Sequence, residues 1–267
     1  MAIQLTLPDP NFKRHFDGSD NASGTVGPGF ASIKLTNDQK ILVSRTNSQR
    51  LLARAVAGQK WNIDINYHPM TRAEFEPVFN FLLAKQGPLT PFFVSLPQYR
   101  TPQNSTWATS AASGTITPRV EGAVTAGASQ VIMQAFDHAS IGSSSTIPVW
   151  HPDTHPGYIY PNGPKPGDMI TFEDSADTTH TKAYLITSAE TKNEVNSLDA
   201  DQVQLTVTPP LAKNVANHAH IVLGNKRQGV TTLLVPKVKV VMPQPIKEYS
   251  LNTDNLYSFN LKLEEYL

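Results

Sequence analysis

Residues 61–97 of the chain, WNIDINYHPMTRAEFEPVFNFLLAKQGPLTPFFVSLP, predict a strand, a capped helix and a second strand in direct succession. Large and polar side chains alternate in residues 60–67, which is the period of a strand with one buried face. Pro69 ends this strand. The large side chains expected on its buried face are Trp61, Ile63, Ile65 and Tyr67.

The helix of this stretch begins with the pattern of a capping box. The Glu74 carboxylate can accept the backbone N–H of Thr71, while the Thr71 hydroxyl accepts the N–H of Glu74. Gly87 favours the left-handed conformation that ends a helix, and Pro88 cannot continue it. A helix laid across a sheet is a scaffold and carries no catalytic signature. The apolar stripe expected to face the sheet consists of Phe75, Val78, Phe79, Leu82 and Leu83.

The composition favours a loop-rich, mainly β protein of the α+β kind. The chain has 267 residues, and its 21 prolines and 15 glycines divide it into short elements. Charged residues make up 16% of the chain and the formal net charge is zero, which argues against electrostatic recognition of nucleic acid or a membrane surface. Because the chain has no cysteine, disulfides and thiolate sites are excluded.

No apolar run approaches the roughly 20 residues that span a bilayer, so we expect no membrane insertion. Residues 1–20 lack the apolar core of a secretory signal, and we expect no conventional export signal.

Three regions follow from the changes in pattern along the chain. Residues 1–30 are expected to form an N-terminal arm that packs on a neighbouring subunit in an assembly, or else a disordered tail. Residues 31–110 and 224–267 are expected to form one core domain, because the alternating strand at residues 256–267 can complete the sheet begun in the first segment. Within this core, Gly58 is predicted to lie in the turn of a β-hairpin. Residues 98–114 are polar and aperiodic and predict a linker.

Residues 111–223 are expected to form an inserted domain, a small β-barrel. Short strand-like segments recur here at fairly regular spacing, and each is closed by Gly, Pro, Asp or Asn. A long loop without a regular period occupies residues 137–166. The predicted strands are residues 115–120, 129–134, 168–173, 182–187, 202–208 and 219–223.

The histidines predict no metal site and no cofactor. His151 and His155 have helical spacing, but the intervening and following prolines prevent a helix, and an exposed turn is favoured over a metal site. We expect His218 and His220 to form a solvent-facing pair on one strand, and His180 to lie in a solvated loop.

The residues of common catalytic sites are not found, and we predict that the protein is not an enzyme. There is no G-x-S-x-G motif and no cysteine nucleophile. The segment Gly163–Asp168 resembles a phosphate-binding loop only superficially, since it leads into a strand rather than a helix. The neighbouring acids Glu173 and Asp174 alternate faces on a strand, so they do not converge as an acid–base pair.

Three aromatic residues of the long loop are candidates for a glycan or partner contact. Trp150, Tyr158 and Tyr160 can stack on sugar rings if they are exposed. The alternative, which we favour, is that they hold the loop against the barrel.

The chain resembles minor tail and baseplate proteins of tailed bacteriophages, in particular the distal tail protein and hub-ring family. The resemblance covers about residues 31–97, 115–212 and 256–265, and its motifs are structural and degenerate. The segments that carry it are Gly58–Trp61, Phe79–Leu82 with Gly87, Pro91–Pro97, Val120–Ala123, Ala126–Ala128, Lys165–Phe172, Tyr184–Thr187, Leu205–Leu211 and Tyr257–Glu265.

The resemblance implies a ring-forming, tail-tube-like β-sandwich with one packed helix, which carries an inserted oligonucleotide/oligosaccharide-binding (OB)-like barrel. It implies a virion structural protein of the tail tip, assembled in the host cytoplasm and often hexameric. Its expected partners are further copies of itself, the tail tube protein, and hub and receptor-binding or tail fibre proteins. The alternative hypothesis is a glycan-binding adhesion module that uses the three aromatic residues of the long loop.

Overall fold

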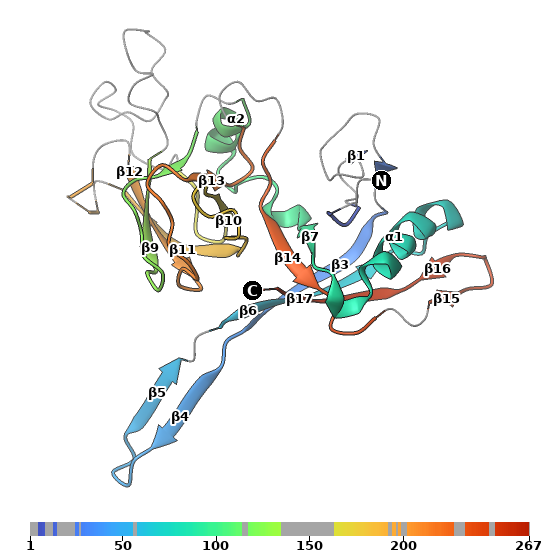
Figure 1. Ribbon diagram of the computed structural model, residues 1–267, viewed down its shortest axis with the longest axis horizontal. Helices are drawn as coiled ribbons and strands as arrows, with labels where there is room; N and C mark the ends of the chain where they lie inside the picture. The colour runs from blue at the N-terminus through green and yellow to red at the C-terminus, as the bar shows by residue number, and fades with distance from the viewer. Residues whose placement is uncertain are drawn as a thin grey trace. The chain divides into compact units, whose positions relative to one another are not determined.

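The computed structural model is mainly β: of the residues that it describes, 14% are helical and 42% are in strands (Figure 1). It divides into two compact units: unit 1 is Met1–Val94 with Val238–Leu267, and unit 2 is Ser95–Lys237. Residues 95–110 and 224–237, which we expected in the core domain, therefore belong to unit 2. The structure describes residues 5–8, 13–14, 25–26, 28–55, 58–113, 117–134, 163–191, 194–195, 197–198, 202–226, 233–245 and 249–266.

Unit 1 is built on a five-stranded sheet with the strand order β3-β6-β17-β14-β7. The C-terminal strand pairs antiparallel with β6, with Leu261 opposite Ile65, so the predicted completion of the sheet by the chain end is confirmed. The alternation of β6 is also confirmed, because all four large side chains of its expected buried face are buried. The strands are β3 (Phe30–Asp38), β6 (Lys60–Tyr67), β7 (Phe92–Ser95), β14 (Lys237–Val241) and β17 (Asn260–Glu265).

Helix α1 (Arg72–Lys85) begins and ends close to the predicted positions, but its buried face differs from the predicted stripe. The Thr71 N–H donates to the Glu74 carboxylate over 2.9 Å, as the capping box predicts. Leu83, expected in the stripe, is 47% exposed, whereas the cationic Lys85 is buried with its Nζ 4.9 Å from the centre of the Phe81 ring. The reason is geometric: at about 100° per residue the buried residues fall within an arc of roughly 120° around the helix, and Leu83 lies about 80° outside that arc. The buried residues of the helix are Phe75, Val78, Phe81, Leu82 and Lys85.

The end of α1 is fixed by two successive left-handed residues. Gln86 has φ 54° and caps the helix, and Gly87, with φ 69°, starts the short 3-10 helix η1 (Gly87–Leu89). A Cβ on Gly87 would lie 3.1 Å from the Pro245 nitrogen. Glycine is therefore required here both by the backbone conformation and by the close approach of another segment.

The predicted β-hairpin turn at Gly58 is wrong. Strands β4 (Ile41–Arg45) and β5 (Leu51–Ala55) pair with each other, and β3 pairs with β6 up to Asp38 opposite Lys60. The chain therefore leaves the sheet after β3, reverses between β4 and β5, and returns into β6 through Gly58, which has φ 99°. The positive φ of Gly58 suits a glycine, but strand pairing decides where the chain reverses.

The two edges of the five-stranded sheet differ. At the β7 edge, Leu7 N–H donates to the Phe93 carbonyl and Phe93 N–H donates to the Leu5 carbonyl, each over 2.8 Å. Part of the expected N-terminal arm thus lies on its own sheet, with Leu7 buried. At the other edge, β3 pairs only with β6 among the described strands. Two short ribbons complete the unit: β1 (Lys13–Arg14) with β2 (Thr25–Val26), and β15 (Ser250–Leu251) with β16 (Tyr257–Ser258).

Unit 2 contains the predicted barrel, which is closed by six strands in the order β10-β11-β12-β9-β8-β13. Inward-facing residues alternate along β12, where Val203, Leu205 and Val207 are buried. This gives the barrel a continuous apolar core. The strands are β8 (Arg119–Val120), β9 (Gln130–Gln134), β10 (Met169–Glu173), β11 (Tyr184–Glu190), β12 (Gln202–Thr208) and β13 (His220–Val222).

The predicted linker at residues 98–114 is wrong. The segment contains the 3-10 helix η2 (Pro97–Tyr99) and helix α2 (Ser105–Ser113), and Trp107 and Ala111 pack in the barrel core. The Asn104 side-chain oxygen caps the start of α2 by accepting the Trp107 N–H over 3.3 Å. The short helix carries small residues around one large aromatic residue, so its buried face has too few apolar side chains to show a helical period.

Candidate functional site

The most exposed apolar surface of the described chain lies on the hairpin, which we define as residues 40–55. Its strands meet in register from Ile41 opposite Ala55 to Arg45 opposite Leu51. The turn is held by the N–H of Gln49 donating to the Thr46 carbonyl over 2.9 Å. Neither strand pairs with a third strand of the described chain, and Figure 1 shows the hairpin extending beyond the end of β6.

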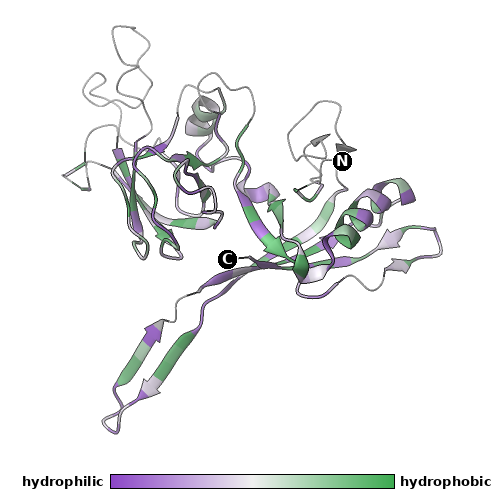
Figure 2. Cartoon of the chain, in the orientation of Figure 1, coloured by the Kyte–Doolittle hydropathy of each residue, from purple (hydrophilic) through white to green (hydrophobic). Residues whose placement is uncertain are grey.

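The apolar side chains of the hairpin are not covered by unit 1. Five of the eleven large hydrophobic residues that are exposed in the described chain lie in this one segment, each between 49% and 65% exposed. Figure 2 shows hydrophobic residues along both of its strands. These side chains lie on both faces of the hairpin, and exposed apolar surface of this kind is typical of interaction sites. The five residues are Ile41, Leu42, Val43, Leu51 and Leu52.

The hairpin is also uniformly basic. It contains four cationic side chains and no acidic one, although the whole chain has zero net charge. The rest of the chain therefore carries an excess of four acidic residues. The four cations are Lys40, Arg45, Arg50 and Arg54.

A second partly exposed surface lies over the beginning of α1 and the β15–β16 ribbon. The buried Phe75 ring stacks on Tyr257, with ring centres 4.4 Å apart, and on Phe79, 4.9 Å apart. Tyr249 packs 5.1 Å from Phe75 and remains about half exposed, as does Leu251. We call Phe79, Tyr249, Leu251 and Tyr257 the aromatic patch.

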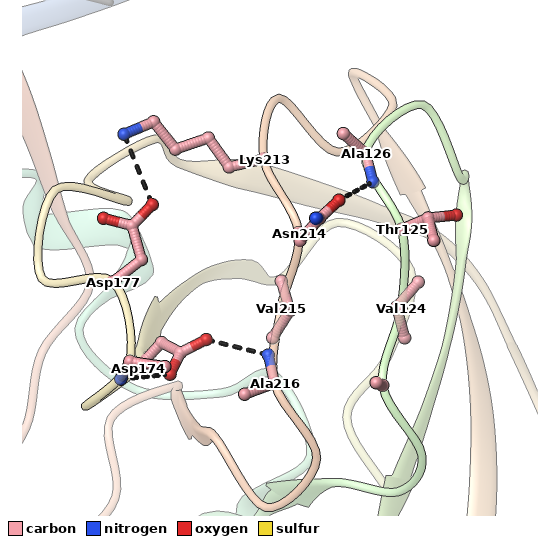
Figure 3. A pocket seen from close by; sticks show the side chains of 11 residues that line it. Val124, Thr125, Ala126, Asp174, Asp177, Lys213, Asn214, Val215 and Ala216 are labelled. Carbon is pink, nitrogen blue, oxygen red and sulfur yellow. Dashed lines mark hydrogen bonds and ion pairs between the residues drawn. The ribbon is translucent and has the colours of Figure 1, made fainter.

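The barrel carries a pocket of about 600 Å³ between three loops. Figure 3 shows that the side chains of Asp174, Asp177 and Lys213 come from two of these loops and that residues 123–126 form the opposite wall. The pocket combines two carboxylates and one cation with small apolar residues.

The polar groups of this pocket hold the loops of the barrel together. The Asp174 carboxylate accepts the N–H groups of Ala176 and Ala216, each over 2.8 Å. Asp177 Oδ2 lies 3.4 Å from Lys213 Nζ, and hydrogen bonds from Thr179 lower the pKa of Asp177, with a smaller contribution from Lys213. These hydrogen bonds give the pocket a structural role, since its carboxylates are used to fix backbone positions.

The expectation that His180 lies in a solvated loop is wrong. Its side chain is buried, and its Nε2 lies 2.7 Å from the Tyr184 hydroxyl, which accepts the Ala212 N–H over 2.9 Å. Burial is the main reason that the pKa of His180 is lowered. The Asp- and Thr-rich sequence around it predicted solvent, but the turn folds its one imidazole inward against Phe172.

The expected pair of His218 and His220 is also not formed on one strand. His220 lies in β13 and is half-buried, and burial lowers its pKa. His218 is exposed and lies before the strand with φ 65°, so the alternation of a strand does not reach it.

The predicted glycan or partner residues Trp150, Tyr158 and Tyr160 lie outside the described residues, as do His151 and His155. Within the ranges that the structure describes, no three His, Asp or Glu side chains come close enough to hold a metal ion. None of the helices in those ranges has the length and apolar character needed to cross a membrane.

Comparison with models of known protein families and with curated proteins finds no match for this chain. The exposed hairpin was missed by sequence reasoning. Its signal was present in the sequence as two β-rich segments with apolar residues on both faces, a pattern that a half-buried strand does not have.

Proposed function

We propose that this protein is a structural component of a bacteriophage tail tip or baseplate, of the distal tail or baseplate ring type. It would form a ring, expected to be hexameric, that joins the tail tube to the hub and the receptor-binding or tail fibre proteins. The proposed role is non-enzymatic and needs no cofactor. Its location would be the virion tail tip, after assembly in the host cytoplasm.

The observation that carries the assembly part of this proposal is the exposed hairpin next to the open β3 edge. A long edge strand with unpaired backbone groups is a template for pairing with another chain, and proteins that remain monomeric usually cover or charge such an edge. Here the edge strand continues into a segment whose apolar side chains are exposed. These features favour a protein that buries this surface in an assembly.

The phage part of the proposal rests on the resemblance described above. We also propose the specific folds that the resemblance implies: a tail-tube-like β-sandwich for unit 1 and an OB-like barrel for unit 2. A five-stranded sheet covered by one helix and a closed barrel inserted at mid-chain are compatible with both.

Native mass spectrometry and negative-stain imaging of the purified full chain test the proposal, alone and mixed with the tail tube protein of the same virion. We expect rings with a fixed subunit number, either in isolation or on the tube. A monomer at all concentrations that also fails to bind the tube protein would contradict it. If that monomer bound sugars on a glycan array, and Trp150→Ala abolished binding without lowering the melting temperature, the adhesion hypothesis would replace it.

A further inference from the structure

We propose that the hairpin of one copy binds the aromatic patch of a second copy of this chain. The inference rests on the self-assembly part of the proposed function and specifies which two surfaces meet. It follows from three properties of these surfaces: their separation within unit 1, their side-chain chemistry and their charge.

The hairpin cannot reach the aromatic patch of its own chain. The hairpin leaves the sheet at the Lys60 end of β6, whereas the patch lies at the other end, where Met70 N–H donates to the Tyr257 carbonyl over 2.9 Å. The eight residues of β6 separate these two ends by roughly 25 Å at about 3.3 Å per residue. Figure 1 shows the hairpin and the β15–β16 ribbon at opposite ends of the sheet of unit 1. A contact between these surfaces is therefore intermolecular.

The side chains of the two surfaces complement each other. The hairpin offers branched aliphatic side chains and guanidinium groups and has no aromatic residue. The patch offers the ring faces and edges of Phe79, Tyr249 and Tyr257, which pack around the buried Phe75. Arginine binds over aromatic rings, and aliphatic residues bury well against them, so each surface supplies what the other lacks.

The charges of the two surfaces are also complementary. The exposed carboxylates of Glu74 and Glu76 lie on the first turns of α1, and exposed Asp254 lies in the turn between β15 and β16. The exposed cation Arg72 pairs with Glu76 over 2.6 Å, so the described charged residues named here carry an acidic excess around the patch. The charged residues of the hairpin are all cationic. Opposite charges at the rim of such a contact favour this orientation over a contact between two hairpins.

Such a contact is heterologous, since different surfaces of the two copies meet. A heterologous contact that repeats around an axis closes into a ring, and one that does not close gives a filament. In a closed ring the hairpin and the aromatic patch of every copy would both be buried. In an open filament each end copy would leave one of the two surfaces free.

The absence of cysteine makes a direct test possible. Two single-cysteine variants of the full chain are prepared, Leu52→Cys on the hairpin and Tyr249→Cys on the patch, and are mixed under oxidising conditions. We expect a disulfide-linked dimer from the mixture and little from either variant alone. The matched control replaces Tyr249→Cys with Leu89→Cys, an exposed residue in η1 beyond the other end of α1.

A charge-reversal series provides a second readout. Arg54→Glu and Glu76→Arg are each expected to weaken self-association about tenfold or more, and a mixture of the two variants should recover part of this loss. Both positions are exposed, so melting temperatures close to the parental value would show that the variants fold; the loss of the exposed Arg72–Glu76 pair is expected to cost little stability.

The outcomes separate this inference from the proposed function. Rings that form while Leu52→Cys and Tyr249→Cys give no mixed disulfide, or a link to Leu89→Cys of equal yield, would overturn the inference and leave the ring proposal standing. Monomers in every condition, including with the tube protein, would overturn both. A hairpin that crosslinks only to the tube protein would overturn the inference and identify that protein as the occupant of the hairpin.

Discussion

His180 shows how burial changes the behaviour of a single residue. Burial lowers the pKa of its imidazole, so below about pH 6.5 the unfolded chain binds more protons than the folded one. Stability is therefore fully present above the unfolded pKa and is lost as the pH falls towards the folded pKa. Within that window each pH unit costs up to about 1.4 kcal/mol.

The prediction is that His180→Gln removes part of the loss of stability on acidification. Thermal melts of the full chain between about pH 7 and pH 5 measure it. His218→Gln, the same substitution at an exposed position, serves as the control. If both variants retained the parental profile, the acid sensitivity would have to come from other groups.

Gly87 is a residue at which two constraints coincide, a positive φ and contact with Pro245. Gly87→Ala is expected to destabilise unit 1 by about 1–3 kcal/mol, measured by urea unfolding. Gly58→Ala is the matched control, because Gly58 also has a positive φ but has no atom within 4 Å of the added Cβ. Equal losses for the two variants would mean that the Pro245 contact contributes nothing.

Helix α2 contributes side chains to the core of the barrel, so we expect it to stabilise unit 2. Trp107 is buried in the barrel core, so Trp107→Ala should destabilise unit 2 by about 3–5 kcal/mol. Thr109→Ala on the exposed face of the same helix should change the free energy of unfolding by about 0.5 kcal/mol or less. Denaturant unfolding followed by far-ultraviolet circular dichroism measures both. A small effect of Trp107→Ala on the free energy of unfolding would indicate that residues 98–114 act as a linker after all.

We expect the hairpin to contribute little to the stability of unit 1, because its described side chains are exposed. Replacing residues 40–57 with Asn-Gly should leave the melting temperature of the monomer nearly unchanged, because the side chains of residues 40–54 are exposed. The same deletion should abolish the proposed self-association, as measured by sedimentation. A large drop in the melting temperature would instead show that the hairpin supports the fold of unit 1.

At the scale of the whole molecule, the two units have separate cores. The barrel of unit 2 closes on itself, and its apolar cluster is formed by residues of that unit alone. We therefore predict that residues 95–237 fold as an isolated fragment. Its melting transition in calorimetry should match one transition of the full chain, and an unfolded fragment would show that unit 2 depends on unit 1.

The positions of most elements could be predicted from the sequence, since periodicity and caps are local properties. Alternation located β6 and β17, and the Thr71–Glu74 pair located the start of α1. Closure of the mid-chain strands into a barrel also followed from their number and spacing. The reason is that a buried face leaves a period in the residues that form it.

Tertiary structure alone decided features that depend on what lies opposite a segment. The pairing of β4 with β5 and of β3 with β6 decided that Gly58 does not lie in a turn between two paired strands. Packing against the barrel decided that residues 105–113 form a helix and that His180 is buried. The hairpin is likewise exposed because of the tertiary structure: its two strands pair only with each other and with no other strand of the described chain. A sequence states which side chains are apolar, but only the fold determines which of them remain uncovered.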